Sequence, residues 1–238
     1  MKQGLFFTII MLVAFGIAYY IFEYLLPDYI KAGGPLVVIL IMLSIILITF
    51  IFERLFMLHL ARGKSSLRKF AKNVKDEIFS GNVDAAIELC DKQRGTFANV
   101  LRASLEKYKE IKKTANNMTA KETMDDIKRT IDETMTLETP LLERNLVVLS
   151  TIASIATLVG LLGTTIGMIR AFRALAHAGA PDAIQLSVGI SEALINTAGG
   201  LFCAILGIVF YNIFTTRIDN FTYVIDETCI AIFNKLIK

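Results

Sequence analysis

Four apolar stretches, each about as long as a bilayer core is thick, dominate this chain of 238 residues. They run over residues 5–26, 36–58, 146–172 and 184–214. A helix needs about 20 predominantly apolar residues to cross a hydrocarbon core of roughly 30 Å. Hydrophobic residues make up 54% of the chain, above the roughly 45–50% of soluble domains. The stretches therefore predict an all-α, polytopic membrane protein with four spans.

The first stretch has two interpretations, a retained membrane helix and a cleaved signal peptide. A signal peptide has an apolar core of about 7–15 residues and a cleavage site of small residues. This stretch is longer, only Lys2 precedes it among charged residues, and no such site follows. We favour a retained helix. Tyrosines cluster at its far end, as in an interfacial aromatic belt: Tyr19, Tyr20, Tyr24 and Tyr29.

A polar region separates the second and third stretches. Three helices are expected there, over residues 83–93, 96–113 and from about 119 onward. Asn82 is placed to cap the first, and Thr119 with Glu122 forms a capping-box pattern at the start of the third. Pro140 is expected to bend or interrupt that third helix.

Basic residues set the expected orientation, because cytoplasmic segments carry an excess of Lys and Arg. Residues 59–145 contain 17 of the 25. Both termini are then cytoplasmic, and the loops 27–35 and 173–183 lie outside. The expected parts are 1–35 (membrane helix and outer loop), 36–62 (second membrane helix), 63–145 (cytoplasmic helical region), 146–216 (a membrane helix pair) and 217–238 (a cytoplasmic C-terminal helix).

Small residues form a stripe along the third stretch. They recur at intervals of three or four, which places them on one helix face: Ser150, Ala153, Thr157, Gly160, Thr164, Gly167 and Ala171. Gly163 and Gly167 also form a GxxxG pattern, which permits close approach between membrane helices. Close helix packing is the minimal interpretation of this face.

The fourth stretch contains an acidic residue, Glu192, about nine residues from its outer end, or roughly 13 Å deep. A carboxylate inside a membrane is costly unless it is protonated, paired or wetted. Asn196 lies one turn further along on the same face. Small residues continue the surface: Thr197, Gly199, Gly200, Cys203, Ala204 and Gly207.

Depth connects the two helices. Thr164 also lies about nine residues from the outer end of its helix, so Thr164 and Glu192 are expected at one membrane level. Thr197 lies about a turn and a half further inward. Two interpretations remain open: a short wetted path for protons, or a Glu that only hydrogen-bonds a Thr between packed helices.

The strings LVGLLGTTIGMIRAF and VGISEALINTAGGLFCAILGIVFYNIF carry a family resemblance. They resemble the ExbB/TolQ family, relatives of the MotA flagellar stator, most strongly over residues 140–220. The similarity is weaker over 36–139, and the first span is additional to the usual three-span plan. The family pattern commonly has Pro where Thr157 stands and Ala where Asn196 stands.

The resemblance implies that Thr164, Glu192 and Thr197 line a pore, with Asn196 and Thr157 beside them. It implies a homopentamer in the bacterial inner membrane, in which the pair 146–216 encloses the pore. It also implies a single-span partner of the ExbD/TolR type with an essential Asp. The resulting motor, driven by the proton-motive force, would energise a TonB-like protein and transport across the outer membrane.

Other functions compete with this ExbB-type role. A TolQ-like motor, a MotA-like or gliding motor, and a passive helical membrane scaffold share the same helices. An enzyme is disfavoured because no nucleophile–base set, metal cluster or phosphate loop is found, and His59 and His177 fall on opposite membrane sides. No cofactor or nucleic acid is expected. The cysteines are expected to be reduced and structural: Cys90, Cys203 and Cys229.

Overall fold

The computed structural model describes residues 2–64, 66–114, 119–176 and 182–236. Within these ranges the regular elements are helices, with no strand, so the all-α prediction is confirmed. Four helical segments are long and apolar enough to cross a membrane: Thr8–Leu25, Pro35–Ala61, and one each within Ala120–Ala176 and Ala183–Asn234. By length and composition, the four predicted spans are confirmed.

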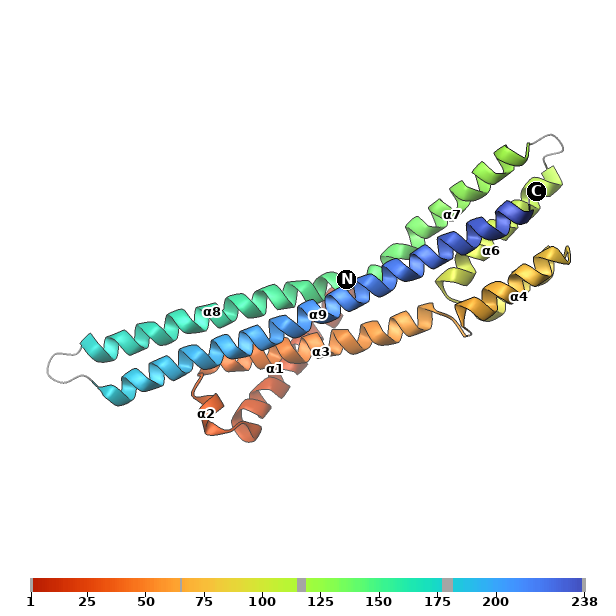
Figure 1. The fold of residues 1–238 in the computed structure, drawn as a ribbon. Helices are drawn as coiled ribbons and strands as arrows, with labels where there is room; N and C mark the ends of the chain where they lie inside the picture. The colour runs from red at the N-terminus through yellow and green to blue at the C-terminus, as the bar shows by residue number, and fades with distance from the viewer. Residues whose placement is uncertain (1, 65, 115–118, 177–181, 237–238) are drawn as a thin grey trace. The chain divides into compact units, whose positions relative to one another are not determined.

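Figure 1 shows the helices of the described residues. In chain order they are α1 (Lys2–Tyr20), the π-helical turn η1 (Ile21–Leu25), α2 (Asp28–Lys31), α3 (Pro35–Ala61), α4 (Leu67–Phe79), α5 (Val83–Gln93), α6 (Thr96–Thr114), α7 (Ala120–Glu143), α8 (Leu146–Ala176) and α9 (Ala183–Leu236).

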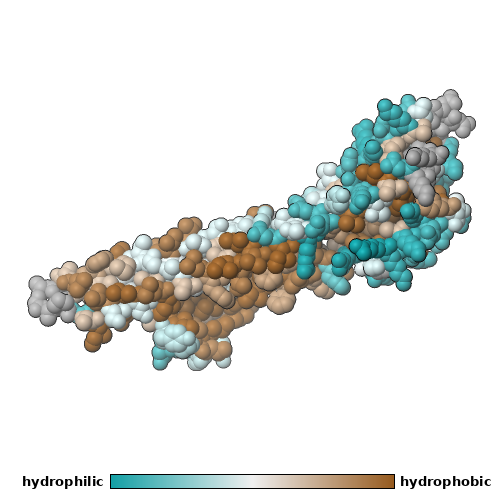
Figure 2. Space-filling view, viewed as in Figure 1, coloured by the Kyte–Doolittle hydropathy of each residue, from teal (hydrophilic) through white to brown (hydrophobic). Residues whose placement is uncertain are grey.

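The chain forms two compact units. The first contains Met1–Glu53 and Asn145–Ile213, and the second contains Arg54–Arg144 and Phe214–Lys238. Both α3 and α9 therefore contribute to each unit. Apolar surface gathers over the helices of the first unit, and hydrophilic surface gathers over α4 to α7 (Figure 2). This partition places the membrane spans in one unit and the polar helices in the other.

In the first unit, α8 and the first half of α9 run antiparallel at very short separation. A Cβ added to Gly167 would lie 2.6 Å from the carbonyl oxygen of Gly189, and one on Gly200 would lie 2.6 Å from that of Ala156. Gly160 and Gly207 also face the partner helix, whereas Gly199 faces Leu40 of α3. Only glycine permits backbones to approach this closely, so these positions set the register of the hairpin.

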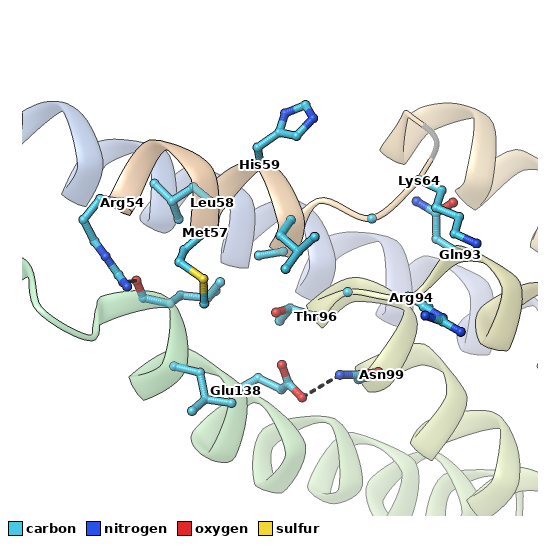
Figure 3. A pocket seen from close by; sticks show the side chains of 16 residues that line it. Arg54, Met57, Leu58, His59, Lys64, Gln93, Arg94, Thr96, Asn99 and Glu138 are labelled. Carbon is cyan, nitrogen blue, oxygen red and sulfur yellow. Dashed lines mark hydrogen bonds between the residues drawn. The ribbon is translucent and has the colours of Figure 1, made fainter. Parts of the chain in front are cut away.

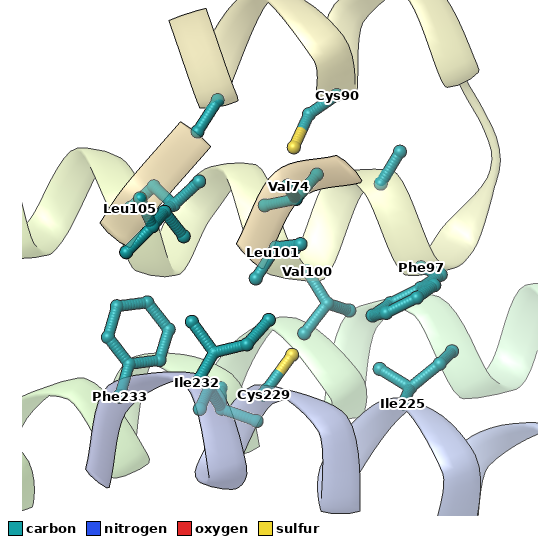
Figure 4. Packing of buried hydrophobic residues seen from close by; sticks show 14 of the residues in the cluster. Val74, Cys90, Phe97, Val100, Leu101, Leu105, Ile225, Cys229, Ile232 and Phe233 are labelled. Carbon is teal, nitrogen blue, oxygen red and sulfur yellow. The ribbon is translucent and has the colours of Figure 1, made fainter. Parts of the chain in front are cut away.

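The second unit has a core built from α4, α5, α6, α7 and the C-terminal part of α9. The apolar stripe of α6 is buried in it, with Phe97, Val100, Leu101 and Leu105 at most 1% exposed. Figure 4 shows side chains of α9 packing against this stripe: Ile225, Cys229, Ile232 and Phe233. Amphipathic helices that are polar on one face thus bury the other face together.

All three cysteines are buried and unpaired, as their expected structural role requires. Burial raises the pKa of the Cys90 thiol to about 12. The thiol of Cys90 therefore stays protonated near neutral pH, and such buried thiols are inert.

Several predicted helix ends are confirmed and others are wrong. The side chain of Thr119 and that of Glu122 form both hydrogen bonds of a capping box. Asn82 stands at the N-cap of α5, but its side chain makes no capping hydrogen bond. Of the expected bend or interruption at Pro140, the interruption is wrong, because α7 continues to Glu143. The break falls later, at Asn145, whose φ is +63°.

Two further differences concern whole helices. The helix α4 was not predicted, although Phe70, Val74 and Ile78 recur at intervals of four and are all buried. The expected C-terminal helix over 217–238 is helical as far as Leu236, and it is the continuation of α9, which runs without a break from Ala183. Arg217, Asp219 and Asn220 near its middle are exposed, and the helix continues through them.

Candidate functional site

The buried acid of the hairpin has an arginine partner. The side chain of Glu192 is 3% exposed, and that of Arg170 is 55% exposed. The Nη1 atom of Arg170 donates to Oε1 of Glu192 at 2.7 Å and to Oε2 at 2.6 Å. Arg keeps its charge in proteins, so α8 supplies a permanent cation to the carboxylate on α9. The pairing is one of the ways in which a membrane tolerates an acid.

A glycine turn before α3 covers the same carboxylate. The φ of Gly34 is +71°, a backbone conformation that L side chains rarely adopt. A Cβ on Gly34 would also lie 2.8 Å from Oε1 of Glu192. Glycine is therefore required here for conformation and for space, and Gly34 closes over the ion pair.

Asn196 fastens this turn to α9. Its side chain is fully buried, and Nδ2 donates to the carbonyl oxygens of Gly33 at 2.7 Å and Glu192 at 2.9 Å. A Cβ on Gly163 of α8 would collide with the same side chain. The Oδ1 atom of Asn196 is buried without a hydrogen-bond partner. Asn196 therefore occupies the junction of three segments, which explains an amide where the family resemblance predicts Ala.

The threonines lie elsewhere on the hairpin. Oγ1 of Thr164 donates to the carbonyl oxygen of Leu161 at 2.6 Å, and Oγ1 of Thr157 donates to that of Ala153 at 3.0 Å. Oγ1 of Thr197 bonds across the hairpin to the carbonyl oxygen of Gly160 at 3.4 Å. All three side chains are half-buried. Each hydroxyl group is therefore partly accessible and donates a hydrogen bond to a backbone carbonyl.

By their contacts, the predicted site residues divide into two groups, and the first group also contains residues that were not predicted. The first, the ionic cluster, contains Arg170, Glu192, Asn196 and the turn Gly33–Gly34. The second, the hydroxyl row, contains Thr157, Thr164 and Thr197. Five residues separate Glu192 from Thr197, which is about 140° around a helix. The two residues therefore occupy different flanks of α9.

The sequence predicts Thr164 and Glu192 at one membrane level. Gly163 contacts Asn196 and Gly167 contacts Ala193, so Thr164 between them lies near the level of Glu192. Among the described residues, however, no hydrogen bond joins Thr164 to Glu192. The acid is bonded to Arg170 instead, and that arginine was not selected in the sequence analysis. Arg170 and Glu192 both lie within three turns of the hairpin tip. This shared position was the sequence signal that could have predicted their pairing.

Metal chemistry finds no support in the part of the chain that the structure describes. No group of three His, Cys, Asp or Glu side chains is suitably placed there. His59 is exposed at the end of α3. His177 lies outside the described residues.

A comparison of the sequence with protein families gives the affiliation. The MotA/TolQ/ExbB proton channel family matches residues 72–227, which include both groups except Gly33 and Gly34. The chain belongs to this family. This confirms the resemblance and identifies a membrane protein of a proton channel family rather than of an enzyme family.

Individual relatives of the MotA/TolQ/ExbB family are similar over parts of the chain. The Tol-Pal system protein TolQ of Pseudomonas aeruginosa is 38% identical over 94 residues, 40% of this chain and 41% of the relative. The biopolymer transport protein ExbB of Salmonella typhimurium is 40% identical over 73 residues, 31% of this chain and 30% of the relative. A Synechocystis protein named ExbB-like 1 is 29% identical over 192 residues, 79% of this chain and 70% of the relative.

The matched part spans less than half the length of the TolQ and ExbB relatives. TolQ and ExbB proteins match at nearly the same identity. The comparisons therefore give the family. They do not favour an ExbB role over a TolQ role.

Proposed function

We propose that this chain is the stator or channel subunit of an ion-driven motor in the bacterial inner membrane. The observation that carries the proposal is a buried, arginine-paired carboxylate on a membrane hairpin in a member of a proton channel family. A passive scaffold gains nothing from an acid at this place, because burying a charge costs free energy even when it is paired.

In this proposal, Thr164 and Thr197 of the hydroxyl row line a proton path, with Thr157 at its inner end. Glu192 supplies a fixed charge behind the path, and Asn196 holds it in register. Copies of the chain form a ring, a homopentamer by family resemblance, whose hairpins surround the path. The helices α4 to α7 face the cytoplasm, because residues 59–145 carry 17 of the 25 Lys and Arg of the chain.

A single-span partner of the ExbD/TolR type completes the motor. Its Asp takes up a proton on one side and crosses the apolar part of the ring in neutral form. In charged form it stays beside the hydroxyl row. Each proton supplies about 2.3 kcal/mol per 100 mV of membrane potential. This alternation moves the partner stepwise, and the ring remains the fixed part.

The motor has two candidate tasks. The ExbB relatives support the energising of a TonB-like protein for transport across the outer membrane, and the TolQ relatives support a Tol-Pal role. Deletion of the gene separates the two tasks. Loss of cargo uptake with an intact envelope supports the ExbB-type role, whereas leakage of periplasmic proteins supports the TolQ-type role.

Threonine-to-valine substitutions test the path, since they remove a hydroxyl group and keep the side-chain shape. We expect Thr164→Val and Thr197→Val each to reduce partner-dependent transport in cells on the order of tenfold, which corresponds to about 1.4 kcal/mol of barrier. Thr165→Val is the matched control, because Thr165 bonds within α8 as Thr164 does but is exposed and lies outside the hydroxyl row. Immunoblots of membranes measure insertion and ring assembly in parallel.

One outcome would contradict the role of the hydroxyl row. Full transport by both Thr164→Val and Thr197→Val, at normal amounts of protein, would favour the passive scaffold and remove the hydroxyl row from the mechanism.

A further inference from the structure

The second unit contains a cavity of about 600 Å³ that the motor proposal does not use. Three segments line it: the last turns of α3, the turn between α5 and α6, and the end of α7. All of its lining residues belong to the same unit, so its geometry is defined within one compact body.

The two ends of the cavity differ in chemistry. At one end lie Met57 and Leu58 of α3 together with the buried Arg54, and at the other lie Lys64, Gln93 and Arg94 (Figure 3). Leu141 and Leu142 of α7 extend the apolar wall. The cavity is therefore amphipathic along its length.

The rim at the cationic end is preformed. The backbone N–H of Lys64 donates to the carbonyl oxygen of Gln93 at 3.1 Å, which joins the turn after α3 to the turn before α6. Gly63 and Gly95 have φ values of +80° and +91°, and a Cβ on either would collide with the backbone of the opposite turn. These two glycines let the turns interlock, so the cavity does not need to be opened by a ligand.

Charge at the cavity favours an anion. Lys64 and Arg94 are exposed cations on its rim, and Arg54 is buried, with Nη1 donating to the carbonyl oxygen of Leu142 at 3.3 Å. The acidic lining residue, Glu138, accepts a hydrogen bond of 2.8 Å from Nδ2 of Asn99. The rim therefore presents two cations to a ligand.

The cavity also lies at the level where the hydrocarbon core ends. About 20 helical residues span that core. Counted from the start of α3 at Pro35, they end near Arg54, where the first charges occur. Met57 and Leu58 then lie at the acyl boundary, and Lys64 lies among the head groups.

We propose that this cavity binds one anionic phospholipid of the leaflet on the side of the charged helices α4 to α7. Its phosphate lies between Lys64 and Arg94, and an acyl chain lies against Met57, Leu58 and Leu141. An amphipathic ligand with one negative charge matches both ends of the cavity, and basic pockets beside membrane helices recognise such head groups. The proposal is independent of the motor function.

Lipid titration of the purified full-length protein tests it. The protein in neutral detergent is titrated with phosphatidylglycerol or phosphatidylcholine, and bound lipid is counted by native mass spectrometry. We expect phosphatidylglycerol to bind about tenfold more tightly, and the double variant Lys64→Gln/Arg94→Gln to lose this preference. The control Lys121→Gln/Lys128→Gln removes two exposed cations of α7 away from the cavity and should keep the preference.

A second variant addresses the acyl end. Leu141 is 58% exposed, so Leu141→Gln should fold normally and weaken both lipids alike. Equal binding of the two lipids to the natural protein would overturn the proposal. An unchanged preference for phosphatidylglycerol in Lys64→Gln/Arg94→Gln would also overturn it. The cavity would then be assigned to a neighbouring copy or a partner helix. Displacement of the lipid by equimolar glycerol phosphate would also contradict a role for the acyl chain.

Discussion

Arg170 and Glu192 form an ion pair across the hairpin, so the effect of substituting one depends on the other. A carboxylate that is 3% exposed loses nearly all of its hydration, and the ion pair with Arg170 offsets that loss only in part. Such a pair contributes little net stability, but removal of one member leaves an uncompensated buried charge.

The pair predicts an asymmetric response to substitution. Arg170→Met should destabilise the protein by about 1–3 kcal/mol, less than for a fully buried pair because the guanidinium group is half-exposed. Arg170→Met/Glu192→Gln should recover most of that loss, since no unpaired charge then remains. Thermal unfolding in detergent measures both, and Arg173→Met, an exposed arginine one turn away, is the control. Equal stability of Arg170→Met and Arg173→Met would show that the ion pair has no structural role.

At this scale the sequence was informative about types of residue and less so about partners. Glu192 and Asn196 are singled out by polarity inside an apolar stretch. The partner of Glu192 depends on the register of two antiparallel helices, which a single helix pattern does not contain. The contact with Gly34 joins residues 158 positions apart in the chain, and no local spacing reveals it.

Close packing of α8 on α9 depends on glycines at the contact. A Cβ on Gly163 would overlap the side chain of Asn196, which is itself fixed by hydrogen bonds to Gly33 and Glu192. The side chain has little freedom to move away. The hairpin and the turn before α3 therefore depend on the same contact.

The prediction for Gly163→Ala follows from this overlap. The extra methyl group should separate the helices or displace Asn196, at about 1–3 kcal/mol, a common cost of overpacking. Gly16→Ala is the matched control, since a Cβ at Gly16 has nothing within 4 Å. Thermal unfolding and the protease sensitivity of the loop after α8 measure the difference. A natural melting temperature for Gly163→Ala would contradict the close contact.

Helix existence was more predictable than helix ends. The expected helix over 96–113 and the capping box of α7 rest on local patterns, and both are confirmed. Pro140 does not end α7, because a proline removes one hydrogen bond but neighbouring turns can retain the helix. The unbroken length of α9 was missed since Arg217 and Asp219 mark a change of polarity, and a change of polarity does not require a change of backbone.

For the whole molecule, the apolar stretches alone predicted the class and the four spans. The division into two units cuts through α3 and α9, at Glu53–Arg54 and at Ile213–Phe214, so single helices belong to a membrane part and to a polar part. Composition does not reveal that α3 and α9 belong to both units, because the division depends on which helices each half of α3 and α9 contacts. The number of copies in a ring and the partner's place are properties of an assembly and follow from the motor proposal.

Proton flux is the most direct measure of that proposal. The chain and its single-span partner are reconstituted in liposomes with a pH gradient, and a dye inside reports proton entry. We predict partner-dependent flux for the natural protein and a loss on the order of tenfold for Glu192→Gln, while Glu23→Gln, an exposed acid near α1, keeps the natural rate. Assembly of each variant is measured by size-exclusion chromatography of the complex. Undiminished flux through a correctly assembled Glu192→Gln complex would contradict the assigned role of the buried acid.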